Sequence, residues 1–138
     1  MIPFDKQRLS SAIDELGLGM VVLFGSYAKR RPAPGPDSDV DVAVYGCPGD
    51  EYWACYRALA EVFGDADLDL VRLEDADPLF RHEIMQSGRL LDGDPDLFYE
   101  YRAYAYRDFV DSADLFALEQ TLFEKKMARI KGLLHDSP

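Results

Sequence analysis

The stretch from Met20 to Val44 constrains the fold more than any other part of this sequence. It opens with an apolar run, Met20–Phe24, which is bounded by glycines and too short for a helix, so it predicts a strand buried on both faces. Gly25 and Ser26 then turn the chain into a connector rich in proline and glycine. The stretch closes on the strictly alternating run Ser38–Val44, which predicts a second strand.

The predicted second strand carries two aspartates, Asp39 and Asp41. Because strand side chains alternate between faces and the backbone rises about 3.3 Å per residue, the two carboxylates are expected on one face, roughly 6 to 7 Å apart at the backbone. A third strand is predicted within residues 65–73, where Asp67 and Asp69 alternate with apolar residues. Asp69 is the preferred third carboxylate because apolar residues flank it on both sides, and Asp67 stays as the alternative.

This constellation fits the chemistry of phosphoryl transfer. Three carboxylates from neighbouring strands suit two Mg²⁺ ions, which prefer oxygen ligands and share substrate phosphates. Gly25 lets a phosphate approach the backbone closely, and Ser26 offers a hydroxyl and an N–H group. A leaving pyrophosphate can be neutralised by the densest basic cluster of the chain, which is Lys29, Arg30 and Arg31.

Composition narrows the class of partner. The chain has 138 residues and a formal net charge of -11, which argues for one domain and against free DNA or RNA as the main partner, because phosphate contacts need a basic face. Cys47 and Cys55 match neither a zinc-ligand spacing nor a redox pair and are expected to be reduced thiols. No signal-peptide pattern and no apolar run of membrane-spanning length is present, so a cytoplasmic location is expected.

Three helices are predicted around these strands. A helix over residues 5–16 has apolar side chains at helical spacing and a glycine at its end. A second is predicted over residues 51–63, with Asp50 as its N-cap. A third is predicted over residues 78–87, with Asp77 at the N-cap and a proline at the first helical position.

The rest of the chain is expected to be a helical tail. Leu90 and Leu91 add a short extended piece, after which one long helix or two abutting helices run from residue 95 to about residue 134. The predicted organisation is a catalytic core over residues 1–93 and a helical C-terminal segment over residues 94–138.

Aromatic residues mark this tail. Phe109, Phe116, Phe123 and Ile130 recur at every seventh position. One interpretation is that this row packs on the sheet and completes the core. The other is that the row is left exposed for a partner protein, because aromatic side chains are enriched at the centres of interfaces.

Together these motifs resemble those of the minimal nucleotidyltransferases of the DNA polymerase beta superfamily, most closely the MNT antitoxins that pair with HEPN toxins. The matching segments are Phe24-Gly25-Ser26-Tyr27-Ala28-Lys29, Asp37-Ser38-Asp39-Val40-Asp41-Val42-Ala43-Val44, Leu68-Asp69-Leu70-Val71, Asp77-Pro78-Leu79-Phe80-Arg81-His82-Glu83-Ile84 and Gly88-Arg89-Leu90-Leu91. The resemblance covers roughly residues 8 to 110. It implies a nucleotidyltransferase fold of the α/β (α+β) class, in which helices flank a small mixed sheet and a long helical segment ends the chain.

The resemblance also implies roles for two groups of residues. The catalytic carboxylates and metal ligands would be Asp39, Asp41 and Asp69. The residues that hold the triphosphate of ATP would be Gly25, Ser26, Lys29 and Arg30. The metals would be two Mg²⁺ ions, and Asp69 would also deprotonate the acceptor hydroxyl.

The function implied by the resemblance is transfer of AMP from ATP to a tyrosine hydroxyl of a cognate HEPN RNase toxin. This reaction would silence the toxin within a hetero-oligomer, without direct contact to nucleic acid or membrane. One alternative is a non-catalytic antitoxin that masks its toxin by stoichiometric binding through the tail. Another is a small-molecule nucleotidyltransferase of the aminoglycoside type, although 138 residues leave little room for its separate acceptor pocket.

Overall fold

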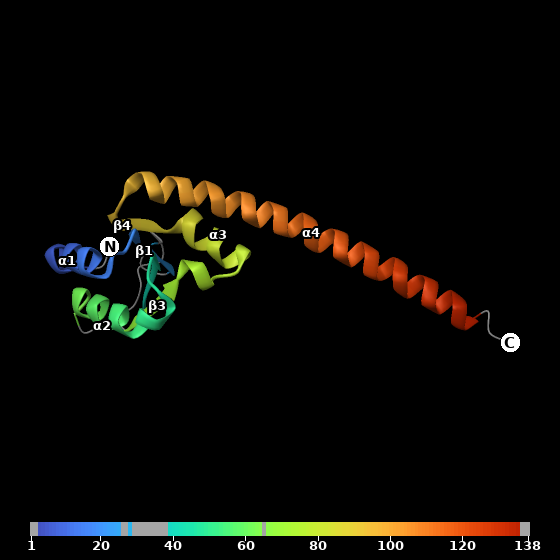
Figure 1. The fold of residues 1–138 in the computed structure, drawn as a ribbon, viewed down its shortest axis with the longest axis horizontal. Helices are drawn as coiled ribbons and strands as arrows, with labels where there is room; N and C mark the ends of the chain where they lie inside the picture. Colours follow the sequence, from blue (N-terminus) through green and yellow to red (C-terminus); the bar gives the residue numbers. More distant parts are fainter. Residues whose placement is uncertain (1–2, 26–27, 29–38, 65, 136–138) are drawn as a thin grey trace.

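The computed structural model describes residues 3–25, 28, 39–64 and 66–135 of the chain (Figure 1). The helices are α1 (Lys6–Leu16), α2 (Tyr52–Val62), α3 (Pro78–Ser87) and α4 (Pro95–His135), with short 3-10 helices at Gly49–Glu51 and Leu73–Asp75. The strands are β1 (Met20–Phe24), β2 (Val40–Tyr45), β3 (Leu68–Arg72) and β4 (Arg89–Gly93).

The strands form one mixed sheet in the order β3-β2-β1-β4. β1 runs antiparallel to both of its neighbours, whereas β2 and β3 run parallel. β1 has the predicted bounds, and β4 is the extended piece expected around Leu90. β2 begins at Val40, so Asp39 lies directly before the strand and not within it. The expected fold class, a small mixed sheet flanked by helices with a long C-terminal helix, is confirmed.

Helices cover both faces of the sheet. α1 and α2 pack on one face in a cluster that contains Val21 and Leu23 of β1. α3 and the start of α4 pack on the other face in a cluster that contains Met20 and Val22 (Figure 1). These four β1 side chains are fully buried, which confirms that this strand is covered on both faces.

Side-chain caps fix the ends of two helices. Asp5 accepts hydrogen bonds from two backbone N–H groups of the first turn of α1, and Gly17 ends that helix in the left-handed conformation. Asp77 caps α3 as predicted, accepting from the Phe80 N–H at 2.8 Å. The expectation that Asp50 caps α2 is wrong, because Asp50 lies inside the 3-10 helix Gly49–Glu51 and no side chain caps α2.

The tail is one continuous helix, α4, which starts in the core and then leaves the body of the molecule (Figure 1). Phe98, Tyr101 and Ala105 are buried against α3 and the sheet. Farther along, the side chains of Phe116 and Phe123 are 62% and 58% exposed. The interpretation that the seven-residue row completes the core is therefore wrong beyond Phe109, because nothing in the described part of the chain covers the projecting turns.

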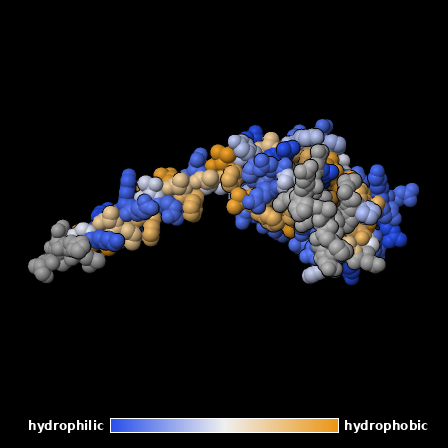
Figure 2. Space-filling view, turned by 180° about the vertical axis from the view of Figure 1, so that it is seen from behind, coloured by the Kyte–Doolittle hydropathy of each residue, from blue (hydrophilic) through white to orange (hydrophobic). Residues whose placement is uncertain are grey.

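The projecting part of α4 carries apolar side chains in contact with solvent (Figure 2). They are Leu115, Phe116, Leu118, Leu122, Phe123, Ile130 and Leu133. We call this set the α4 apolar row. None of the helices that the structure describes has both the length and the apolar character that crossing a bilayer requires.

Candidate active site

Two of the predicted carboxylates stand side by side on neighbouring strands. The register of the parallel pair places Asp41 of β2 opposite Asp69 of β3, and on its other side Asp41 is opposite Phe24 of β1. The exposed side chain of Asp69 and the half-buried side chain of Asp41 therefore meet at one end of the sheet. The β2–β3 register distinguishes Asp69 from Asp67, which lies before β3 with its carbonyl accepting from the Val40 N–H at 2.7 Å.

Both carboxylates lie on the face of the sheet that carries α3 and α4. On β2, Val40 and Val42 belong to the cluster under α1 and α2, whereas Ala43 belongs to the opposite cluster. Because side chains alternate along a strand, Asp41 shares the face of Ala43. The same alternation on β3 places Asp69 on the face of Val71, which packs beside α3 and α4.

Gly25 follows β1 and lies against the Asp41 carboxylate. Its φ of +72° is a backbone conformation that residues with a side chain rarely adopt. A Cβ added to Gly25 would overlap the Asp41 side chain. Gly25, which was predicted to let a phosphate approach closely, therefore also makes room for the Asp41 carboxylate.

Burial is the largest cause that raises the pKa of Asp41 to about 6, and the nearby charges of Asp69 and Asp39 add to it. A side-chain hydrogen bond with Asp69 acts in the same direction. This end of the sheet thus concentrates negative charge, which disfavours ionisation of one carboxyl group and favours a bound cation.

In the described part of the chain, no three His, Cys, Asp or Glu side chains converge closely enough to hold a metal ion between them. Asp39 is exposed and lies directly before β2. The donor set nevertheless fits Mg²⁺ in kind, because such ions are commonly held by one or two carboxylates together with substrate phosphates.

Three predicted phosphate-binding residues, Ser26, Lys29 and Arg30, lie outside the described residues. The same is true of Arg31, whereas Ala28 is described and buried. Of the predicted triphosphate-binding residues, only Gly25 is thus placed by the structure.

Tyr52 of α2 supports β3 from the opposite face of the sheet. Its hydroxyl donates a hydrogen bond to the Leu70 carbonyl at 2.7 Å. Burial raises the pKa of the Tyr52 hydroxyl, and the Asp69 charge adds to the shift. This contact fixes the strand directly beside the exposed Asp69 carboxylate.

A cavity of about 400 Å³ opens next to Gly25. Its aromatic wall is the pair Phe24 and Phe80, whose rings meet edge to face with centroids 5.8 Å apart. Other lining residues come from α3 and include Glu83 and Gln86. No sequence motif marks this cavity, although Phe80, Glu83 and Ser87 share one side of the predicted helix by their spacing.

The comparison with protein families matches residues 9–96 to the model described as "Polymerase beta, Nucleotidyltransferase". No curated protein sequence matches the chain. A chain of a mutant MntA–HpeT toxin–antitoxin crystal structure is similar with a TM-score of 0.60 and 19% identity, over 94% of this chain and 98% of that chain.

Two further solved structures share this fold. A chain of a toxin–antitoxin crystal structure with AMP-PNP gives a TM-score of 0.60 at 21% identity, over 94% of this chain and 98% of that chain. A chain from the complex of tri-AMPylated Shewanella oneidensis HEPN toxin with MNT antitoxin gives 0.54 at 20% identity, over 94% and 95%. With the family match over most of its length and the paired aspartates beside Gly25, this chain belongs to the polymerase beta nucleotidyltransferase family.

Proposed function

We propose that this chain is an antitoxin that transfers AMP from ATP to a tyrosine hydroxyl of a cognate HEPN RNase toxin. The observation that carries the proposal is the pairing of Asp41 with Asp69 beside Gly25, within a chain of the nucleotidyltransferase family. The similar folds of chains from a HEPN–MNT complex and from a toxin–antitoxin structure with AMP-PNP support the choice of partner and of ATP.

Asp39, Asp41 and Asp69 would hold the two Mg²⁺ ions of this reaction. When bound, Mg²⁺ supplies positive charge that stabilises the transferring phosphoryl group and the leaving oxygen. Burial and then the charges of Asp69 and Asp39 raise the pKa of Asp41, and this grouping of carboxylates supports the assignment because it attracts a divalent cation.

The reaction exchanges one bond to the α-phosphorus for another, and side chains of this protein accept the proton and hold the triphosphate. The tyrosine oxygen of the acceptor attacks the α-phosphorus of ATP, its bond to phosphorus forms as the bond to the pyrophosphate oxygen breaks, and pyrophosphate leaves. Asp69 accepts the hydroxyl proton, since it is the exposed member of the pair. Gly25, Ser26, Lys29 and Arg30 hold the triphosphate.

The C-terminal segment, residues 94–138, is proposed to bind the toxin. The α4 apolar row supports this role because a large exposed apolar stripe marks an interaction site. The row also favours a second candidate function, in which the chain neutralises its toxin by stoichiometric binding alone. Both activities can reside in one molecule.

Incubation with ATP, Mg²⁺ and the HEPN protein encoded beside this chain tests the enzymatic proposal. The expected result is a mass increase of the HEPN protein by whole AMP units, with the modified residue located by peptide sequencing. A control with Asp39→Asn and Asp41→Asn together should bind the partner but leave its mass unchanged. An unchanged mass with the natural chain would eliminate the catalytic proposal.

The two candidate functions separate in cells. If transfer neutralises the toxin, the double aspartate variant should leave growth arrested when the toxin is expressed. If binding alone suffices, the double variant should protect as well as the natural chain, and only shortening of α4 should abolish protection.

A further inference from the structure

A second cavity adjoins the one beside Gly25. It has a volume of about 430 Å³ and lies between α3 and α4. Gln86 lines both cavities, so they adjoin each other at this residue of α3. The other lining residues of this α3/α4 pocket are His82, Tyr99, Arg102, Ala103 and Tyr106.

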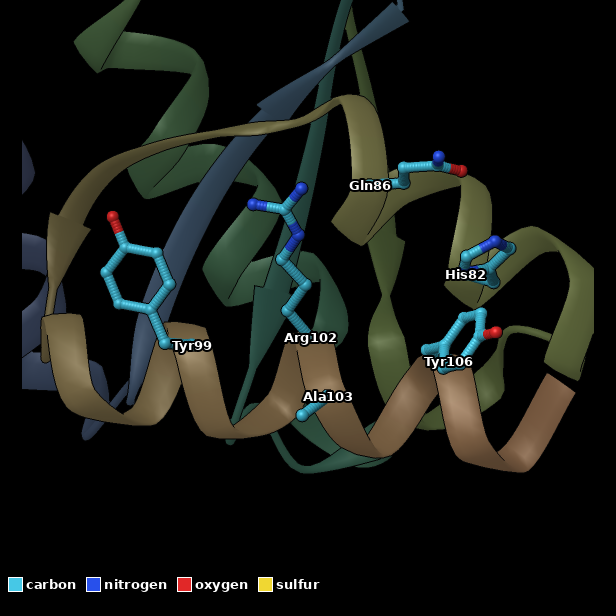
Figure 3. Close-up of a pocket in the computed structure, with 6 residues that line it drawn as sticks. All are labelled: His82, Gln86, Tyr99, Arg102, Ala103 and Tyr106. Atoms are coloured by element: carbon cyan, nitrogen blue, oxygen red, sulfur yellow. The ribbon is translucent and has the colours of Figure 1, made fainter. Parts of the chain in front are cut away.

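Ring contacts of His82 hold one side of the α3/α4 pocket in place, whereas its other lining residues are exposed. Tyr99, Arg102, Ala103 and Tyr106 occupy one side of α4 by their helical spacing and rise from it together (Figure 3). His82 lies over Tyr106, with ring centroids 5.7 Å apart, and stacks on Phe109 at 4.8 Å with 8° between the ring planes.

Arg102 supplies the pocket with a positive charge that no described residue neutralises. Arg102 is exposed and forms no ion pair with any residue in the described ranges. The same holds for Arg57, Arg89, Arg107 and Arg129, but none of these four lines this pocket. In a chain with a net charge of -11, an unneutralised guanidinium in a pocket is suited to an anion from outside the molecule.

Position, not size, argues against ATP as the occupant of this pocket. Each cavity is within the range of roughly 300 to 1,000 Å³ that is typical of ligand pockets. A nucleotide whose phosphates lie at Gly25 has the adjoining cavity of Phe24 and Phe80 available to it. The α3/α4 pocket is then left for a group that reaches the site from the acceptor side.

We propose that the α3/α4 pocket is a docking subsite for the acceptor protein, in which Arg102 pairs with the carboxylate of an acidic residue. The proposal rests on the proposed function, because it assumes a protein acceptor at the Asp41–Asp69 site. Tyr99 and Tyr106 line the same pocket and are 63% and 56% exposed, so a docked acceptor segment would cover them together with the ion pair. Docking here would place the acceptor segment next to the cavity that Gly25 lines, with Gln86 between the two.

The test compares three variants of the full chain with the cognate HEPN protein and AMP-PNP by calorimetry, and with ATP by transfer kinetics. Arg102→Glu reverses the charge in the pocket and Arg102→Gln removes it. Arg107→Glu is the matched control, since Arg107 is an exposed residue of the same helix and does not line the pocket. Unfolding curves confirm that each variant is folded.

Arg102→Glu should raise both the Kd and the KM for the HEPN protein by about tenfold or more, as expected for reversal of a charge at an interface. Arg102→Gln should give a smaller rise, Arg107→Glu should change either constant by less than about twofold, and the KM for ATP should stay constant. Equal effects of Arg102→Glu and Arg107→Glu would overturn the proposal. A selective rise in the KM for ATP would also overturn it and assign the pocket to the nucleotide.

The outcomes also separate the two levels of inference. If the natural chain transfers AMP and Arg102→Glu behaves like the control Arg107→Glu, the docking subsite is refuted and the proposed function is retained. If the natural chain binds the HEPN protein without transfer, the proposed reaction falls and the Kd values alone decide on the subsite. If the natural chain does not bind the HEPN protein, both fall.

Discussion

Asp41 and Asp69 face each other across the parallel strands β2 and β3, and the first is held against Gly25 while the second is exposed. This relationship makes the two carboxylates unequal. Burial and the neighbouring charges raise the pKa of Asp41 to about 6. Ionisation of the half-buried Asp41 carboxylate therefore opposes folding.

Asp41→Asn should stabilise the metal-free protein at neutral pH. A raised pKa contributes stability that is complete below the unfolded-state value of 3.8 and is lost as pH rises through about 6. At pH 7.5 the variant should gain about 1 kcal/mol in free energy of unfolding, a value reduced from the full shift because the group is partly exposed to solvent. Near pH 4 the gain should vanish. Urea unfolding in EDTA measures it, and a variant less stable than the natural chain at pH 7.5 would contradict it.

Gly25→Ala should destabilise the protein and abolish AMP transfer. The alanine would be strained at a φ of +72°, and its Cβ would meet the Asp41 carboxylate. Gly64→Ala is the matched control, because its φ is +67° and a Cβ there has open space within 4 Å. Gly64→Ala should lower the free energy of unfolding by about 1 kcal/mol through backbone strain alone, and Gly25→Ala should lower it further.

A double-mutant cycle tests whether the additional loss of folding stability in Gly25→Ala comes from contact with Asp41. Asp41→Ala removes the carboxylate that the new Cβ would meet, so the combined variant should cost less than the sum of the two single changes. Strictly additive free energies of unfolding would show that Gly25 and Asp41 do not interact.

The two thiols should resist alkylation until the protein unfolds. Cys47 and Cys55 are both buried and free, and burial is the main cause that raises the pKa of the Cys55 thiol to about 12. Since the thiolate is the reactive form, iodoacetamide should label neither cysteine at pH 8 in buffer and both in concentrated urea. Intact-mass measurement counts the labels, and rapid labelling without urea would show that the core opens around α2.

Shortening α4 at two positions should give opposite results for stability. In residues 115–133 every side chain is exposed except the half-buried Met127, so removal of residues 115–138 should change the melting temperature by less than about 2 °C. Removal of residues 95–138 also deletes Phe98 and Tyr101, which are buried, and should prevent folding. Circular dichroism melts distinguish the two cases, and large destabilisation by the shorter deletion would show that the projecting turns support the fold.

Much of the fold follows from local patterns. The apolar run of β1 needs no partner to be recognised as a strand, and the Asp77–Pro78 pair specifies the start of α3 through a cap that forms within one turn. The pairing of Asp41 with Asp69 can also be predicted from the sequence, because each aspartate alternates with apolar residues in its own strand. Their direct opposition depends on the register of β2 with β3, which alternation alone does not determine.

The features that the sequence does not predict depend on packing between distant parts of the chain. The seven-residue row of α4 shows that its side chains share a face, but periodicity carries no information on whether another element covers that face. Asp50 has the chemistry of an N-cap, yet a 3-10 turn takes up Gly49–Glu51 and α2 begins only at Tyr52. The α3/α4 pocket joins His82 to Arg102, which are far apart in sequence and meet only when α4 packs on α3.

The single helix α4 joins a part that supports the catalytic core to a part that projects away from it. Its first turns are buried in the core, whereas the turns beyond residue 115 project from the body of the protein and carry exposed apolar side chains (Figure 1). Under the proposed function, changes in the projecting turns would alter the choice of toxin without disturbing the chemistry at the sheet. Several such pairs in one cell can thus become insulated from each other by divergence of a single helix.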